Sequence, residues 1–342
     1  MTAHGDDGVR VAELLCDWLE AEFGDPVEMV GSPTSIEGGL DSWIHRVRFS
    51  GAALPAEWRQ PLIARVKRRA DAVAMAHREA DIQEWAARVG YPCPQILAVF
   101  DPGELLDLPV QIMDFVPGVT LLRATTTAPW RAPALVGRLA ELQARLHDLD
   151  PDGLPIGEAP EDLAERRLSL VRSTVDVTDD VALTRGLERV EALLPRLRAA
   201  PAVVCHGDFH PLNVLVDDDD SWVLDWTDAG LGDRHGDVSR TMLLFRLASV
   251  VADGRVQRRA LAVAGPWMAR RHQRAYELHA PLDPARLALW DPVHLLHGWS
   301  QVIGLHHGQF TDAGSDSRTS TVPIALGEQL RSRFETAIGL VE

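Results

Sequence analysis

The most informative part of this chain is the stretch Val203-Val-Cys-His-Gly-Asp-Phe-His-Pro-Leu-Asn-Val-Leu-Val216, followed by Trp222-Val-Leu-Asp-Trp226. Two short apolar runs flank a polar loop, which is typical of a strand, a loop and a second strand. Within the loop Asp208 and Asn213 are five residues apart, and Asp225 follows Asn213 by twelve residues. Asp and Asn in a turn often do no more than hydrogen-bond the backbone. The functional interpretation therefore depends on the length of the pattern and on the strands that flank it.

The same residues fit a chemical requirement. Their order is H-x-D-x-x-x-x-N and then D, the arrangement of the protein-kinase catalytic machinery. A γ-phosphoryl group passing to a hydroxyl spreads negative charge that Mg²⁺ must neutralise, while a carboxylate orients and deprotonates the acceptor. We therefore predict that Asp208 is the catalytic base and that Asn213 and Asp225 are metal ligands. His206 is expected to brace the loop rather than to transfer protons.

At these residues the chain resembles the aminoglycoside phosphotransferase family. The resemblance is carried by His206–Asp217 and Val223–Asp233, is specific over residues 203–240, and is looser but ordered over residues 35–123. It implies an α+β, protein-kinase-like fold of two lobes, a small β-rich N-terminal lobe and a large, mainly helical C-terminal lobe. The segment Val116-Pro-Gly118 is typical of a turn or connector, and we expect it to join the lobes. We therefore place the lobes at 1–115 and 116–342.

Composition and charge limit the classes of protein to which this chain can belong. The 342 residues carry a formal net charge of −16, which argues against a nucleic-acid partner. No apolar run is long enough for a membrane helix. The N-terminus lacks the features of a signal peptide, and three widely spaced cysteines favour a reduced, cytoplasmic protein. We expect a monomer or a homodimer with a small-molecule partner.

Hydrophobic periodicity predicts the elements. In the first lobe we expect helices over 8–23 and 71–89 and strands over 27–31, 42–49, 61–67, 95–100 and 109–113. In the second lobe we expect helices over 130–148, 160–172, 182–198, 235–252, 255–277, 284–306 and 322–341. The acidic run Asp217–Asp220 is expected to be the solvated turn between the catalytic strands, since the spaced ligands of a calcium loop are absent.

A nucleotide site needs a loop that lets backbone N–H groups approach phosphates. Gly38, Gly39 and Ser42 lie in the segment Glu37–Ser42, which resembles the family's loop, although a Gly-Gly turn in a hairpin is commonplace. By the same resemblance, Met113 and Phe115 belong to the connector whose backbone would meet adenine. The nucleotide is expected to be ATP, with GTP as the alternative.

The phosphate-gripping cation has two candidates on one strand face, Arg65 and Lys67. The family's register favours Arg65, whereas kinases usually place Lys there, and Lys67 is the only lysine of the chain. The glutamate that orients the cation is expected to be Glu79 by resemblance, with Glu84 as the alternative.

One further acid and two sets of histidines allow two interpretations each. Asp237 matches a family acid that supports the catalytic loop, but it could equally be the N-cap of the helix that starts near Val238. His294 and His297, and the pair His306-His307, could suggest zinc, although zinc needs three or four converging ligands. We favour their lining an acceptor pocket.

These expectations lead to an enzyme that transfers the γ-phosphate of ATP, with Mg²⁺, to a hydroxyl of a small molecule. The favoured acceptor is an antibiotic of the aminoglycoside, macrolide or nucleoside type. A metabolite kinase acting on sugars, amino alcohols or homoserine-like compounds is the alternative. A nucleotide-binding pseudokinase would have lost at least one of Asp208, Asn213 and Asp225, all of which are present. A protein kinase is disfavoured because the D-F-G and A-P-E elements are missing.

Overall fold

The computed structural model describes residues 4–36, 42–156, 162–218, 220–250, 254–308 and 324–342. They form two compact units, residues 1–118 with 215–227, and residues 119–214 with 228–342. The expected boundary between residues 115 and 116 stays a prediction. What the sequence did not indicate is that the hairpin of the catalytic strands is grouped with the first unit. Among the described helices, none has the length and hydropathy needed to cross a membrane.

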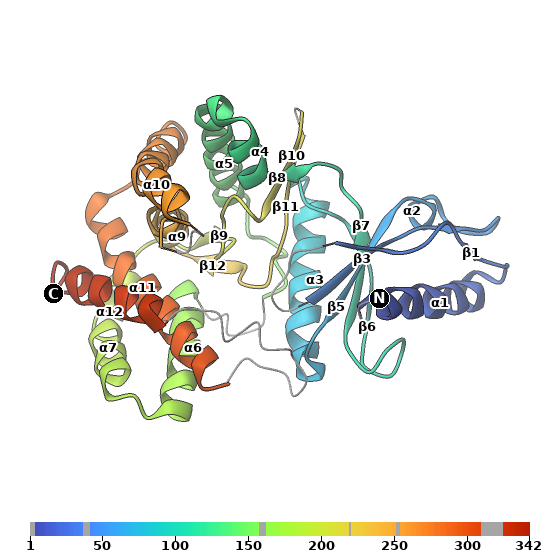
Figure 1. Cartoon of the computed structure of the whole chain (residues 1–342), viewed down its shortest axis with the longest axis horizontal. Coiled ribbons are helices and arrows are strands. Elements are labelled where there is room, and N and C mark those ends of the chain that lie inside the picture. The colour runs from blue at the N-terminus through green and yellow to red at the C-terminus, as the bar shows by residue number, and fades with distance from the viewer. Residues whose placement is uncertain (1–3, 37–41, 157–161, 219, 251–253, 309–323) are drawn as a thin grey trace. The chain divides into compact units, whose positions relative to one another are not determined.

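The first unit is built on a five-stranded antiparallel sheet of order β2-β3-β5-β7-β6 (Figure 1). Its elements are α1 (His4–Phe23), β1 (Glu28–Met29), β2 (Thr34–Ile36), β3 (Ser42–Val47), β4 (Phe49–Ser50), α2 (Ala56–Arg59), β5 (Leu62–Lys67), η1 (Ala70–Ala72), α3 (Val73–Arg88), β6 (Ile96–Phe100), β7 (Val110–Asp114), β10 (Val214–Asp217) and β11 (Asp220–Val223). Strands β10 and β11 are neighbours.

Apolar and basic side chains alternate along the second half of β5, so that one face of the strand packs in the core and the other carries the two cations. Leu62, Ala64 and Val66 pack into the core that α1 supplies, because alternate side chains of a strand share a face. The intervening positions carry Arg65 and Lys67 on the opposite face, beside α3. Figure 1 shows α1 and α3 on opposite sides of the sheet. The central strand thus presents its two cations to one helix.

The second unit is mainly helical. Its elements are β8 (Val119–Thr120), α4 (Leu121–Thr127), η2 (Pro129–Arg131), α5 (Ala132–His147), α6 (Leu163–Thr178), α7 (Val181–Glu191), α8 (Leu194–Leu197), β9 (Val203–Cys205), β12 (Gly230–Gly232), α9 (Arg234–Leu247), α10 (Arg255–Tyr276), α11 (Pro284–His306) and α12 (Ile324–Ile338). Helices α6, α7, α11 and α12 share one apolar core. Strands β9 and β12 pair antiparallel, with Cys205 opposite Gly230.

Most of the expected helices and strands are present, with local differences. The expected strand over 42–49 divides at Arg48, and the part after it, β4, pairs with β1 instead of β5. The expected helix over 182–198 divides into α7 and α8, where Pro195 cannot continue a helix. Short elements without a clear period were missed, namely β2, α2, β8, α4 and β12.

Candidate active site

The catalytic loop follows β9 in the second unit. Gly207 has φ +83°, and a Cβ there would lie 2.5 Å from the carbonyl oxygen of Asp228. Only glycine accepts both the left-handed backbone and this close approach. Asn213 donates its Nδ2 to the carbonyl of Asp208 at 3.1 Å and so closes the loop. The backbone geometry therefore requires the glycine, and the Asn213 side chain holds the loop that presents Asp208.

Asp208 lies between two basic side chains. Its Oδ1 accepts from Nε of Arg240 at 3.1 Å, and its Oδ2 contacts Nε2 of His210 at 3.1 Å. Burial would raise the pKa of this carboxyl, but Arg240 and His210 lower the pKa well below its usual value. The side chain remains 28% exposed. It is thus an ionised carboxylate that a substrate hydroxyl can reach.

Asp237 lies under the loop and is fully buried. Its carboxylate accepts from the N–H groups of Gly207 at 2.6 Å and His206 at 3.4 Å. It also contacts Nε2 of His147 at 3.0 Å and accepts from Nε2 of Gln143 at 2.9 Å. Burial would raise its pKa, but these hydrogen bonds and the nearby histidine lower it.

The alternative role of Asp237 as an N-cap is wrong. Helix α9 begins at Arg234, and its N-cap is Asp233, whose side chain accepts from the N–H of His235 at 3.0 Å. The helix therefore begins one residue before the expected start at 235, and not near Val238 as the N-cap alternative required. His206 is also buried, and its Nδ1 accepts from the N–H of Asp208 at 3.3 Å.

Three residues at this loop were not indicated by the sequence. Arg240 comes from α9, His210 from the loop itself, and Arg167 from α6. Arg167 donates to the carbonyl of Gly207 and to Asp228, the latter at 2.7 Å. For Arg240 a signal was present, since it follows Asp237 by three residues and so lies on the same helix face. For Arg167 there was none.

The first unit contains the candidate phosphate grip. Nη1 of Arg65 donates to Glu79 at 2.5 Å, and Nε donates to Oγ of Ser42 at 3.1 Å. Nζ of Lys67 reaches the other oxygen of Glu79 at 2.8 Å. Both cations thus contact one buried carboxylate. Burial would raise the pKa of Glu79, but the two cations lower it. Glu84, the alternative, is exposed and pairs with Arg88 at 3.2 Å.

Asp225 follows β11 in an unusual backbone conformation. Its φ is +63°, in the left-handed region that non-glycine residues rarely adopt. Its Oδ1 accepts from Oγ1 of Thr227 at 2.8 Å, and Nη2 of Arg65 lies 3.5 Å away. The next residue, Trp226, is buried and packs edge to face against Tyr91. The backbone is anchored on one side while the Asp225 carboxylate stays 42% exposed.

The remaining expected nucleotide residues are placed as follows. Met113 is buried in β7, and the N–H of Phe115 donates to the carbonyl of Pro61 at 3.1 Å. The guanidinium of Arg46 lies 4.1 Å from the ring centre of Phe115. Gly38 and Gly39 fall outside the described residues.

The donors expected for Mg²⁺ fit that ion. Hard cations prefer carboxylate and amide oxygens. The amide nitrogen of Asn213 is bonded to the Asp208 carbonyl, so its oxygen is the atom left to face a cation. Asp225 adds an accessible carboxylate.

The histidines of α11 have a different setting. His294 and His297 are buried, and burial lowers the pKa of each well below its usual value. Nε2 of His294 contacts the carbonyl of Gly236 at 2.8 Å. His306 and His307 are exposed. In the described ranges of the chain, no group of three or more His, Cys, Asp or Glu is arranged to hold a metal.

Comparison with known proteins adds a family and named relatives. The model of a phosphotransferase enzyme family matches residues 56–290, more than half of the chain. An aminoglycoside 3'-phosphotransferase of Streptomyces fradiae is 33% identical over 177 residues, which are 47% of this chain. The match spans 61% of that relative's length, somewhat less than two thirds.

Solved structures share the fold. A thermostable mutant of aminoglycoside phosphotransferase APH(4)-Ia, in a ternary complex with AMP-PNP and hygromycin B, aligns with a TM-score of 0.60 at 17% identity, over 95% of this chain and 97% of that one. A choline/ethanolamine kinase family protein from Mesorhizobium loti gives 0.57 at 17% identity, over 97% and 99%. Together with the sheet-rich N-terminal region and the helical C-terminal part, these likenesses confirm the predicted α+β, kinase-like fold class.

Proposed function

Because this chain belongs to the aminoglycoside phosphotransferase family, we propose that it transfers the γ-phosphoryl group of ATP to a hydroxyl of a small molecule. The observation that carries the proposal is the setting of Asp208. It is an accessible, ionised carboxylate on a loop whose backbone is held by the buried Asp237. That combination suits a group that must orient an incoming hydroxyl.

In the proposed reaction the acceptor oxygen attacks the γ-phosphorus, and the bond from that phosphorus to the β–γ bridging oxygen breaks. The products are ADP and a phosphate ester, and the hydroxyl proton passes to Asp208. The depressed pKa of Asp208 makes it a weak base. We therefore infer that it chiefly orients the hydroxyl and takes the proton late, as a loose transition state allows.

The phosphates are assigned to residues of the first unit. Arg65 can hold a carboxylate and a phosphate at once through its planar fork, and its contacts with Glu79 and Ser42 fix its direction. Asn213 and Asp225 would hold Mg²⁺, which when bound neutralises charge on the transferring phosphoryl group. Lys67 adds a second positive charge at Glu79.

We propose an antibiotic as the acceptor, of the aminoglycoside, macrolide or nucleoside type. The support is the named relative from Streptomyces fradiae and the hygromycin B complex of APH(4)-Ia. A metabolite kinase is the second candidate, because a choline/ethanolamine kinase family protein shares the fold. In both cases the enzyme would act in the cytoplasm as a monomer or a homodimer, with ATP or GTP as donor. A pseudokinase is disfavoured because Asp208, Asn213 and Asp225 are all retained.

The test combines a substrate panel with two variants. ADP release is measured with antibiotics and metabolites that carry hydroxyl groups. With the best acceptor, Asp208→Asn should lower kcat by at least about 100-fold, the usual worth of a positioned proton acceptor, while nucleotide affinity stays nearly unchanged.

Asp217→Asn is the matched control, because Asp217 is an exposed carboxylate at the end of β10. It should keep wild-type turnover. If Asp208→Asn kept more than about a tenth of kcat, the assignment of the base would be wrong.

A further inference from the structure

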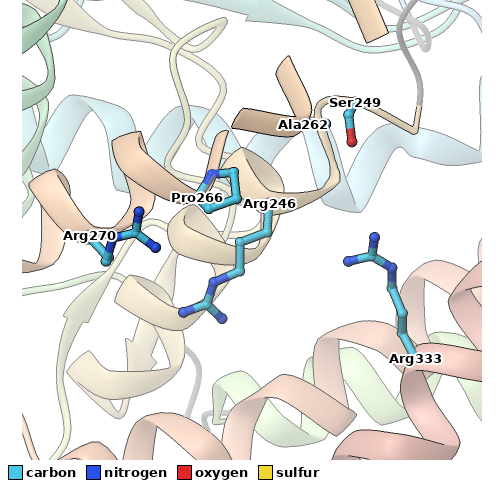
Figure 2. A pocket seen from close by; sticks show the side chains of 6 residues that line it. All are labelled: Arg246, Ser249, Ala262, Pro266, Arg270 and Arg333. Atoms are coloured by element: carbon cyan, nitrogen blue, oxygen red, sulfur yellow. The ribbon is translucent and has the colours of Figure 1, made fainter. Parts of the chain in front are cut away.

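A pocket in the second unit lies among three helices and has no assigned role. Its volume is about 570 Å³. Figure 2 shows side chains entering it from α9, α10 and α12, with Arg333 across the opening from Arg246 and Arg270. The lining residues are Arg246, Ser249, Ala262, Pro266, Arg270 and Arg333.

The charge of the pocket is opposite to that of the chain. Three guanidinium groups line it, although the whole chain has a net charge of −16. Of these three arginines, only Arg246 has a carboxylate oxygen of a described residue within 4.0 Å, that of Asp291 at 3.3 Å. Asp291 also accepts from Oγ of Ser239 at 2.8 Å. Arg270 and Arg333 therefore leave an excess of positive charge in the described part of the pocket.

Helix α10 forms one wall of the pocket and contains a proline. Ala262, Pro266 and Arg270 follow one another at four-residue spacing and share a face. Proline has no N–H, so Pro266 cannot donate to the carbonyl of Ala262, four residues earlier. That carbonyl lacks its usual helical donor beside the cations. A ligand that offers both an anionic group and a hydroxyl would satisfy the two features together.

We propose that this pocket binds the oxyanion group of a small hydroxylated molecule, a carboxylate, phosphate or sulfate. Arginine pairs with such planar or tetrahedral oxyanions through two parallel N–H donors. The pocket shares helix α9 with the catalytic loop. Arg246 follows Arg240, the partner of Asp208, by six residues, a rise of roughly 9 Å. The anion is either part of the acceptor or a separate small ligand.

The direct test is binding of gluconate and of inorganic phosphate, measured by calorimetry at low ionic strength, with uncharged glucose for comparison. Wild type should bind both anions and prefer gluconate to glucose. Arg270→Gln combined with Arg333→Gln should weaken both anions by at least about tenfold, since charge-assisted hydrogen bonds carry the binding. Both arginines are exposed, so the double variant should fold normally.

The matched control is Arg259→Gln combined with Arg274→Gln. These two arginines are exposed on α10 but do not line the pocket, and the net charge changes equally. The control should bind the anions as wild type does. Absence of anion binding by wild type, or equal loss in both double variants, would overturn the assignment of the pocket.

Incubation with ATP separates the two sources of the anion. Phosphorylation of gluconate that the pocket variant loses would identify the anion as part of the acceptor. Binding without phosphorylation would identify a separate ligand site. Anion binding is measured without ATP, so failure of the proposed phosphotransfer and failure of this pocket give different results.

Discussion

The ion pair between Arg240 and Asp208 keeps the Asp208 carboxylate of the catalytic loop ionised. Oδ1 of Asp208 is held at 3.1 Å by a guanidinium that is itself only 12% exposed. A cation this close favours the ionised carboxylate. In the proposed reaction Arg240 is therefore a positioning residue that acts on the acceptor through Asp208.

Replacing Arg240 should change the pH dependence of the reaction. Arg240→Gln removes the cation, so the pKa of Asp208 should rise. Below that pKa Asp208 is protonated and cannot accept a proton. The acidic limb of kcat/KM against pH should therefore move to higher pH, and Arg240→Lys should restore most of it. An acidic limb that stays in place would show that Arg240 serves structure alone.

How much of this site could be predicted depends on where each partner lies in the chain. Asp208, Asn213 and Asp225 could be singled out because their spacing is local and chemically constrained. Arg167 could not, since it reaches the loop from 40 positions away. Arg240, 32 positions away, had only one signal, its place three residues after Asp237 on the same helix face. Their approach depends on the packing of α9 and α6, which no local pattern encodes.

Strand β5 carries both cations that could bind the phosphates of the nucleotide. Arg65 and Lys67 share a face, and the structure brings both to Glu79. Arg65 also has Ser42 and Asp225 as neighbours, and it is less deeply buried than Lys67, 8% exposed against 1%. The sequence left the choice open, and these contacts favour Arg65 for the phosphates and Lys67 for support.

Two variants separate these roles. Arg65→Gln should raise KM for ATP and lower kcat by about 100-fold, the usual loss for a preorganised charge donor. Lys67→Gln should leave KM for ATP within about threefold but lower the free energy of unfolding by about 3 kcal/mol, because it breaks a buried ion pair. Steady-state kinetics and urea unfolding measure both. The opposite ranking of KM would make the chain's single lysine the phosphate ligand.

The sequence predicted the long elements better than the short ones. Amphipathic periods marked α1, α5 and α11, whose apolar faces are buried. Strand β12 is Gly-Leu-Gly and carries no alternation, yet it is needed because it pairs with β9 just before the catalytic loop. Only tertiary pairing identifies it.

At the scale of the whole molecule, buried histidines make stability depend on pH. His272 is buried beside Phe245 with no hydrogen-bond partner for either ring nitrogen among the described residues. Its pKa is lowered to about 3, chiefly by burial; the nearby Asp237 opposes the shift and the nearby His147 adds to it. Burial lowers the pKa of His294 and His297 in the same direction. All three lie in the second unit.

The sign of the effect follows from proton uptake. A histidine in the unfolded chain has a pKa of about 6.5, so below that pH the unfolded state binds a proton that folded His272 refuses. The stability that neutral His272 contributes is complete above about pH 6.5 and is lost as the pH falls toward about 3. The carboxylates with lowered pKa, such as Asp237, add their loss only below about pH 4.

We therefore expect the free energy of unfolding to fall between pH 7.5 and 5.5, with His272 contributing about 1.4 kcal/mol over the pH unit below 6.5. His272→Leu should remove that contribution. At pH 7.5 the same change should not lower the free energy of unfolding by more than the altered packing does, because two unsatisfied buried nitrogens disappear. Urea unfolding followed by tryptophan fluorescence at both pH values measures this, with the exposed His279→Leu as control. If His272→Leu kept the full pH dependence of wild type, His272 would have to be protonated in the folded chain, and the burial argument for it would be wrong.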